Sequence, residues 1–125
     1  MKKKILLIDD ENLIATSFHK LLTKSGYAVS MANTGMVALE ITDNEDFDVI
    51  ISDIRMPWVN GIETIREIQK TLKTKNKKIP GIIFITGYAD IDLERAAKEF
   101  LPVAYMHKPI DIQELLRKVQ EALVA

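Results

Sequence analysis

Charged and hydroxyl side chains stand just after four short apolar runs of the sequence. Asp9 and Asp10 follow the first run, Asp53 the second, Thr86 the third and Lys108 the fourth. If these runs are parallel strands of one open sheet, their carboxyl ends meet at one edge, where such folds place their ligands. Three carboxylates, a hydroxyl and an ammonium group would then share one small site.

That set of groups suits phosphoryl transfer assisted by a divalent cation. Crowded carboxylates repel one another, so Lys108 would offset one negative charge and a hard cation the rest. Mg2+ fits better than Zn2+, because it takes a few carboxylates together with water and phosphate oxygens. Asp53 is the best phosphoryl acceptor by position, since it ends the middle run and a carboxylate can form an acyl phosphate. Asp9 and Asp10 would hold the metal, while Thr86 and Lys108 would bind phosphoryl oxygens.

Each of these residues also has a plain structural explanation. The acidic pair could cap the first helix, and Asp53 could belong to an ordinary turn. Thr86 could cap a helix, and Lys108 could be a solvated surface lysine. These separate explanations do not account for all four groups standing at strand ends on one edge, so we prefer the functional interpretation.

The elements that would position the site alternate along the chain. Apolar runs at 5–8, 49–51, 82–85 and 103–106 are continuous, which is typical of strands covered on both faces, and a less apolar segment at 27–31 suits a sheet edge. Apolar residues at helical spacing follow each run. The strand–helix order, repeated five times, predicts an α/β fold with a parallel sheet and helices on both faces.

Local signals mark the ends of the predicted helices. Gly26 would stop the first helix, Thr34 would cap the second and Asp90 the fourth. Asp111 precedes the fifth with the spacing of a capping box. The apolar stripes of the five helices lie within 14–22, 37–41, 62–72, 91–100 and 112–123.

Composition limits the classes of protein to which the chain can belong. It has 125 residues, 47% hydrophobic and 28% charged, which suits one domain that buries its own core. The absence of cysteine excludes a disulfide scaffold, and the presence of only two histidines makes a zinc site improbable. The net charge of -1 does not indicate a nucleic-acid binder, and no apolar run suits a secretion signal or a membrane span. We expect a cytoplasmic protein.

The ordered motifs resemble those of receiver domains of two-component response regulators. They read IDDE at 8–11, DIRMPWVNG at 53–61, TG at 86–87 and KP at 108–109. The resemblance covers essentially all of 1–125 and implies a single receiver domain. It also implies a flavodoxin-like (βα)5 three-layer sandwich, with a parallel five-stranded sheet of order 2-1-3-4-5.

The resemblance further implies roles for individual residues. Asp53 would be the phosphoryl acceptor and, with Asp10, would coordinate Mg2+ directly (Mn2+ can replace it). Asp9 would act mainly through water, and the backbone carbonyl of Arg55 would complete the protein ligands.

The remaining implied roles concern phosphoryl binding and switching. Thr86 would bind the phosphoryl group and report its arrival, and Lys108 would bridge to it. The Lys108–Pro109 peptide bond is expected to be cis. Tyr105 matches an aromatic position that turns inward on activation.

The implied function is a phosphorylation-dependent switch and not a turnover enzyme. A sensor histidine kinase or a phosphotransfer protein would phosphorylate Asp53, and the fourth helix, fifth strand and fifth helix would change their shared surface. That surface would control a downstream protein or a C-terminal effector domain, and it also serves for homodimers. Direct contact with nucleic acid or membrane is not expected.

Residues at variable positions suggest one specific property. Arg55 and Tyr88 stand two residues after Asp53 and Thr86, and we interpret both side chains as shields that lengthen the life of the acyl phosphate. Trp58 is either a partner contact or packed locally against the site.

Three other classes of function remain as alternatives. A phosphatase of the haloacid-dehalogenase type would need a second Asp where Arg55 stands, and a cap domain. A nucleotide or flavin binder would need a glycine-rich or hydroxyl-rich loop after the first strand. A receiver-like interaction module that is never phosphorylated is the main alternative, against which the intact Asp53, Thr86 and Lys108 argue.

Overall fold

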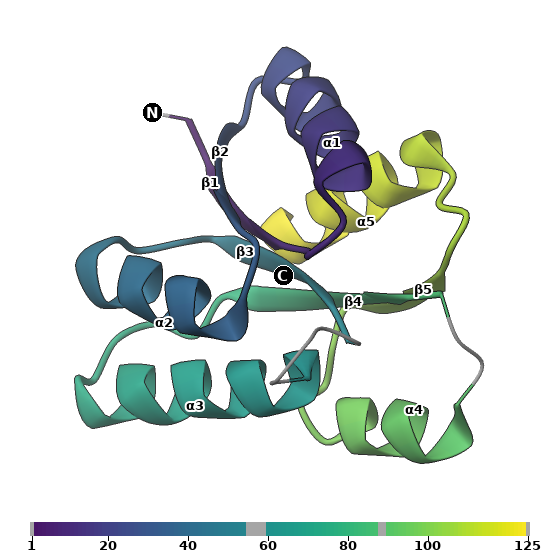
Figure 1. The fold of residues 1–125 in the computed structure, drawn as a ribbon. Coiled ribbons are helices and arrows are strands. Elements are labelled where there is room, and N and C mark those ends of the chain that lie inside the picture. Colours follow the sequence, from purple (N-terminus) through teal and green to yellow (C-terminus); the bar gives the residue numbers. More distant parts are fainter. Residues whose placement is uncertain (1, 55–59, 88–89, 125) are drawn as a thin grey trace.

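A computed structural model describes residues 2–54, 60–87 and 90–124 of the chain. Strands and helices alternate throughout, as the sequence predicts (Figure 1). The elements are β1 (Lys4–Ile8), α1 (Asn12–Lys24), β2 (Ala28–Ala32), α2 (Gly35–Asn44), β3 (Val49–Asp53), α3 (Gly61–Thr74), β4 (Gly81–Thr86), α4 (Ile91–Lys98), β5 (Ala104–His107) and α5 (Ile112–Val124).

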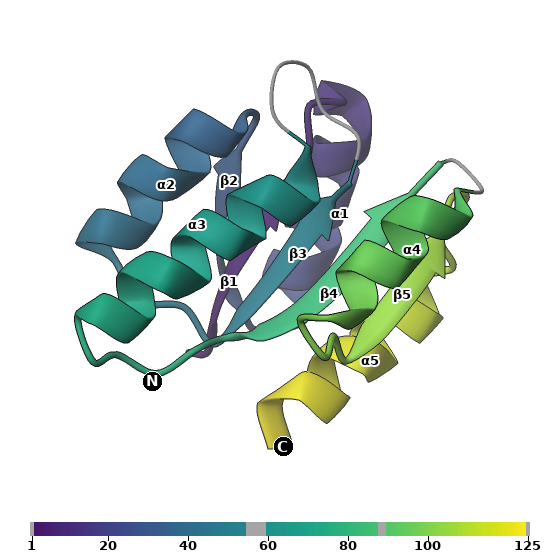
Figure 2. The same cartoon turned by 90° about the horizontal axis from the view of Figure 1, so that it is seen from below.

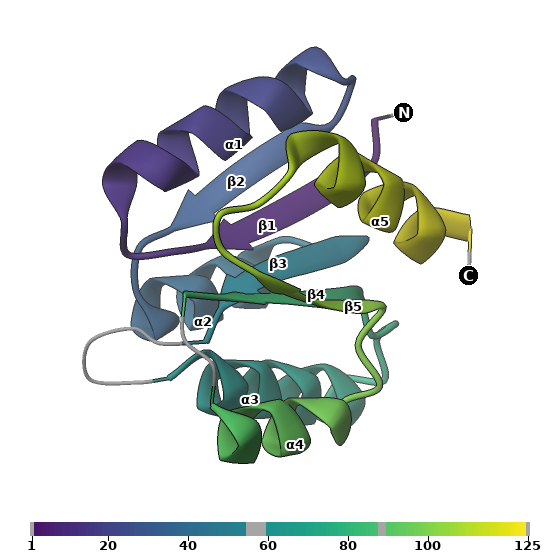
Figure 3. The same cartoon turned by 90° about the vertical axis from the view of Figure 1, so that its right-hand side faces the viewer.

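The five strands form one parallel sheet with the order β2-β1-β3-β4-β5. Helices α1 and α5 cover one face, and α2, α3 and α4 cover the other (Figures 2 and 3). This arrangement confirms the predicted three-layer fold and the sheet order that the resemblance implies. None of the helices in the described part of the chain is long and apolar enough to cross a membrane.

Side-chain alternation divides the core into two layers. In β1, Ile5 and Leu7 pack towards α1 and α5, whereas Leu6 and Ile8 pack towards the three helices on the other face. All four are fully buried. Strands buried on both faces need apolar residues at every position, which explains why the central runs are continuous.

The last strand is less deeply buried than the central ones. The run at 103–106 is expected to be covered on both faces, and both core layers contact it: Tyr105 packs against one, and Val103, Ala104 and Met106 belong to the other. Ala104 and Tyr105 are only half-buried, and His107 is exposed. The coverage is incomplete because β5 is the edge strand opposite β2. Four apolar residues in a row do not distinguish such a strand from a central one.

Short-range caps begin most helices as predicted. The Thr34 hydroxyl accepts a hydrogen bond from the Val37 N–H (3.1 Å), and the Asp90 carboxylate caps α4. Asp111 accepts from the Gln113 N–H at 2.9 Å, and Gly26 follows α1 with φ +97°. Helix α4 ends at Lys98, short of the predicted residue 100.

A leucine occupies the left-handed region of backbone space after α4. Leu101 has φ +49° and its side chain is 88% exposed. Leu101→Gly should raise the free energy of unfolding by about 0.5–1 kcal/mol, because relief of ~1–2 kcal/mol of strain exceeds the added backbone entropy. Urea denaturation tests this, with Asn76→Gly (φ +56°) as control, since asparagine already tolerates this region. Equal effects of the two substitutions would contradict the strain argument.

Candidate functional site

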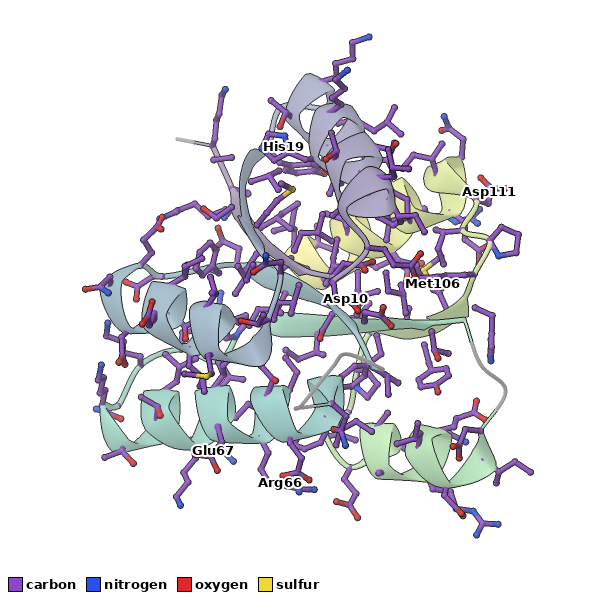
Figure 4. The ribbon with its side chains drawn as sticks, in the orientation of Figure 1. Asp10, His19, Arg66, Glu67, Met106 and Asp111 are labelled. Carbon is purple, nitrogen blue, oxygen red and sulfur yellow. The ribbon has the colours of Figure 1, made fainter. Side chains whose placement is uncertain are left out.

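The predicted site residues stand at the carboxyl edge of the sheet. Asp9 and Asp10 follow β1, Asp53 ends β3, Thr86 ends β4 and Lys108 follows β5. Figure 4 labels Asp10 where the chain turns from β1 towards α1. Parallel strands therefore bring together groups that are far apart in the sequence.

Three carboxylates form the centre of the site. Oxygens of Asp9, Asp10 and Asp53 all lie within 4.8 Å of one another. Asp9 is 1% exposed and Asp53 is 3% exposed, while Asp10 is half-buried. Water can therefore do little to screen their mutual repulsion, and the cluster needs cationic partners.

Lys108 supplies one positive charge to this cluster. Its Nζ lies 3.1 Å from Asp53 Oδ2 and 3.5 Å from Asp9 Oδ2. A third carboxylate, Glu11, is the nearest: its Oε1 accepts a hydrogen bond from Lys108 Nζ at 2.9 Å. Sequence reasoning assigned no role to Glu11, because an acidic residue at the start of a helix is normally explained by the helix dipole.

Burial and charge shift the pKa values of the site. Burial raises the pKa of Asp53 from 3.8 to about 6, although Lys108 opposes this shift. Burial likewise raises the pKa of Asp9. Burial alone would lower the pKa of Lys108, but its hydrogen bonds to Glu11 and Asp53 outweigh that effect and raise it. Lys108 therefore stays in its ammonium form, whereas burial opposes the charged form of the Asp9 and Asp53 carboxylates.

The donor set fits a hard divalent cation. Asp9 Oδ1 accepts a hydrogen bond from the Glu11 N–H, but Asp9 Oδ2 is buried and has no hydrogen-bond partner among the described residues. A buried carboxylate oxygen without a hydrogen-bond partner is costly, and a hydrated cation, through one of its water molecules, would satisfy it. With Asp10 and Asp53 beside it, the site offers the oxygen ligands that Mg2+ prefers. The expected fourth ligand, the Arg55 carbonyl, lies outside the described residues.

Backbone contacts hold the strand ends in place. The Ile54 N–H donates to the Ile85 carbonyl (3.0 Å), and the Lys108 N–H donates to the Thr86 carbonyl (2.8 Å). The Lys108–Pro109 peptide bond is cis. The strand that carries Thr86 is thus joined directly to the acceptor strand on one side and to the lysine strand on the other.

Gly61 allows the start of α3 to approach the acceptor closely. Its N–H donates to the Ile54 carbonyl at 2.6 Å, and a Cβ at this position would overlap the backbone oxygen of Asp53. The side chain of Asn60 caps the same helix. Only glycine therefore permits this contact between α3 and the end of β3.

The two predicted switch residues lie on the neighbouring strands β4 and β5. Thr86 is buried at the end of β4, and its neighbour in register on β5 is His107. Tyr105 is half-buried on β5, with its ring 5.5 Å from that of His107. The Tyr105 hydroxyl is buried without a hydrogen-bond partner in the described structure, and burial, with Glu94 and Asp90, raises its pKa. The proposed shields Arg55 and Tyr88, and Trp58, lie outside the described residues.

Comparison with known proteins identifies similar chains. The family model "Response regulator receiver domain" matches residues 5–120. Sporulation initiation phosphotransferase F of Bacillus subtilis is 32% identical over 98% of this chain and 95% of its own length. Transcriptional regulatory protein ZraR of Klebsiella oxytoca is 38% identical over 95% of this chain, which spans only 26% of that relative.

Two solved structures that resemble this chain are also response regulator receiver domains or contain one. A CheY-like receiver domain from Methanospirillum hungatei has a TM-score of 0.90 and 30% identity, covering 99% of this chain and 95% of that one. A response regulator from Burkholderia pseudomallei, solved with a phosphorylated aspartic acid, a calcium ion and citrate, has a TM-score of 0.82 and 26% identity. The match covers 98% of this chain and 69% of that one.

The raised pKa of Asp53 predicts that Asp53→Asn stabilises the folded protein by an amount that depends on pH. Between about pH 4 and 6, folded Asp53 binds a proton that the unfolded chain has lost, so ionised Asp53 costs stability above this range. In a chelator at pH 7, Asp53→Asn should therefore raise the free energy of unfolding by about 1–3 kcal/mol. The gain should shrink as the pH falls towards 4. A gain that is constant over this range in urea denaturation would refute the assignment.

The close approach of Gly61 predicts a specific steric defect. Gly61→Ala should lower the free energy of unfolding by about 1–3 kcal/mol, because its methyl group displaces the backbone of Asp53. Gly87→Ala is the matched control, since a Cβ there meets only Lys108 Cδ at 3.8 Å. Thermal unfolding of both variants measures the difference. A Gly61→Ala protein as stable as the Gly87→Ala protein would show that the contact is not restrictive.

Proposed function

Because the chain belongs to the response regulator receiver domain family, we propose that it is a signalling switch that accepts a phosphoryl group on Asp53 in a Mg2+-dependent reaction. The observation that carries this proposal is the Lys108 ammonium, 3.1 Å from Asp53 Oδ2 within a cluster of buried carboxylates. That cluster carries more negative charge than Lys108 offsets. It therefore suits a cation and an incoming phosphoryl group together.

The covalent step is a displacement at phosphorus. A carboxylate oxygen of Asp53 attacks the phosphorus of a phosphohistidine on a donor protein. The new O–P bond forms as the P–N bond breaks, and the imidazole leaves with the electron pair and takes a proton from solvent. The product is an acyl phosphate on Asp53.

The chain's own residues stabilise the charge that develops. Lys108 already donates to Asp53 and lies within reach of an oxygen attached there, so little reorganisation is needed. Thr86, from the neighbouring strand, would donate to another phosphoryl oxygen. Asp10 and Asp53 would hold Mg2+ directly and Asp9 through water, and the ion would neutralise charge on the phosphoryl oxygens. The Burkholderia relative with a phosphorylated aspartic acid and a calcium ion supports this chemistry.

Phosphorylation would act by shifting a conformational equilibrium. The Lys108 N–H bond to the Thr86 carbonyl joins β5 to β4, so a displacement of Thr86 towards a phosphoryl group would be felt on β5. Tyr105 lies on that strand, and its buried hydroxyl has no hydrogen-bond partner among the described residues. We infer that Thr86 and Tyr105 move together and reshape the surface of α4, β5 and α5.

This switch would work through binding partners and not through turnover of a diffusible substrate. A sensor histidine kinase or phosphotransfer protein would donate the phosphoryl group in the cytoplasm. Two relatives illustrate how such a domain can occur. In Sporulation initiation phosphotransferase F the match covers nearly the whole protein, whereas in the transcriptional regulator ZraR it covers about a quarter of a longer chain. The output would go to a downstream protein, a second copy of the chain or an effector domain, with residues 1–125 acting as one receiver unit.

Intact-mass measurement after incubation with Mg2+ and a small acyl phosphate tests the reaction. We expect the wild-type protein to gain one phosphoryl group, and Asp53→Asn or an excess of chelator to abolish the gain. Asp46→Asn is the control, because this exposed carboxylate pairs with Lys77 away from the strand ends that form the site. Absence of a gain with both a small donor and a histidine kinase would favour an interaction module that is never phosphorylated.

A further inference from the structure

Glu11 makes the shortest of the three contacts between Lys108 and carboxylates. The distances from Lys108 Nζ are 2.9 Å to Glu11, 3.1 Å to Asp53 and 3.5 Å to Asp9. Only the first two are hydrogen bonds. Glu11 thus takes one of the three N–H donors that Lys108 can offer to ligands at the site.

Helix capping does not explain the position of Glu11. It occupies the N-cap position of α1, but its side chain makes no capping hydrogen bond. Its own N–H donates to Asp9 Oδ1 at 2.9 Å. The side chain instead reaches Lys108 and provides no cap to the helix; glutamate is not among the residues preferred at this position.

Exposure distinguishes the two ends of this ion pair. The Lys108 side chain is 12% exposed and the Glu11 side chain is 54% exposed. Glu11 is therefore the outer partner, and it can return to water at little cost, whereas Lys108 cannot. An anion that enters the site would compete with Glu11 for the same ammonium.

We propose that Glu11 is a positioning residue that holds the Lys108 ammonium before phosphorylation and competes with the phosphoryl group for it afterwards. This inference rests on the proposed role of Asp53 as acceptor. It assigns Glu11 two opposing effects. Glu11 adds negative charge beside the cation-binding carboxylates, but it withholds Lys108 from an anionic donor.

The two effects predict opposite changes in Glu11→Gln. Loss of the charge should weaken Mg2+ binding about two- to fivefold, the range expected for a partly exposed ion pair. At saturating Mg2+, the concentration of small acyl phosphate needed for half-maximal phosphorylation should fall about two- to fivefold, with little change in the maximal rate. If Glu11 had a purely structural role, its substitution would not weaken Mg2+ binding and at the same time lower the concentration of acyl phosphate that is needed.

Two further variants separate contact from charge. Glu11→Asp keeps the charge but is too short to reach Lys108, so its Mg2+ affinity should stay near the wild-type value while its donor requirement falls as in Glu11→Gln. Glu67→Gln removes a charge from an exposed position on α3, where the side chain points away from the sheet (Figure 4), and should change neither quantity.

The measurements are phosphorylation rates by intact mass and Mg2+ titrations by isothermal titration calorimetry. A Glu11→Gln protein that behaves like Glu67→Gln would overturn the proposal. So would a Glu11→Asp protein with the donor requirement of the wild type, because charge alone would then account for the effect.

A measurement without phosphorylation distinguishes failure of this inference from failure of the proposed function. The NMR signal of the Lys108 ammonium should be protected from exchange in the wild type and should shift or broaden in Glu11→Gln. An unchanged signal overturns the Glu11–Lys108 contact. A wild-type protein that takes up no phosphoryl group overturns the acceptor role of Asp53 instead, and with it the competition.

Discussion

The ion pairs of Lys108 are the interactions on which the site depends. Its ammonium is the only described cation in contact with Asp9, Asp53 and Glu11. Removing it would leave buried carboxylates facing one another in a medium of low polarity, where they would take up protons instead of staying ionised. One lysine offsets only part of this charge. The negative charge that Lys108 leaves uncompensated destabilises the folded protein, and the same charge favours binding of Mg2+.

The fold explains how the chain tolerates such a site. Strands β1, β3 and β4 lie between two layers of helices and supply most of the fully buried side chains. Their carboxyl ends stop at one edge, where hydrogen bonds between neighbouring strands hold the acceptor and lysine segments together. The core therefore provides the stability that the acidic cluster removes, and it fixes the positions of groups that repel one another.

Much of this arrangement could be predicted from local sequence. Continuous apolar runs located the strands, and Thr34, Asp90 and Asp111 cap helices where their types and spacing indicated. The convergence of carboxylates at one edge followed from parallel strands alone. The sheet order and the cis peptide bond came only from the resemblance to receiver domains, because no local pattern encodes either.

Other features escaped prediction for physical reasons. The exposure of β5 depends on its being the last strand of the sheet, which its apolar run does not reveal. The contact of Glu11 joins residues 97 positions apart, and an acidic residue at a helix start has a sufficient local explanation. The shift in the pKa of Asp53 arises from burial, which only the folded arrangement defines.

Burial of the Asp53 carboxylate opposes its charged form, and a cation beside it would compensate for that burial. The most direct measurement is the pKa of Asp53 from the pH dependence of its carboxyl carbon NMR signal, with and without Mg2+. We predict a value of about 6 in chelator, falling below the ordinary 3.8 when Mg2+ is bound. A value near 3.8 under both conditions would show that burial does not oppose the charged form of Asp53 and that the site does not depend on a cation.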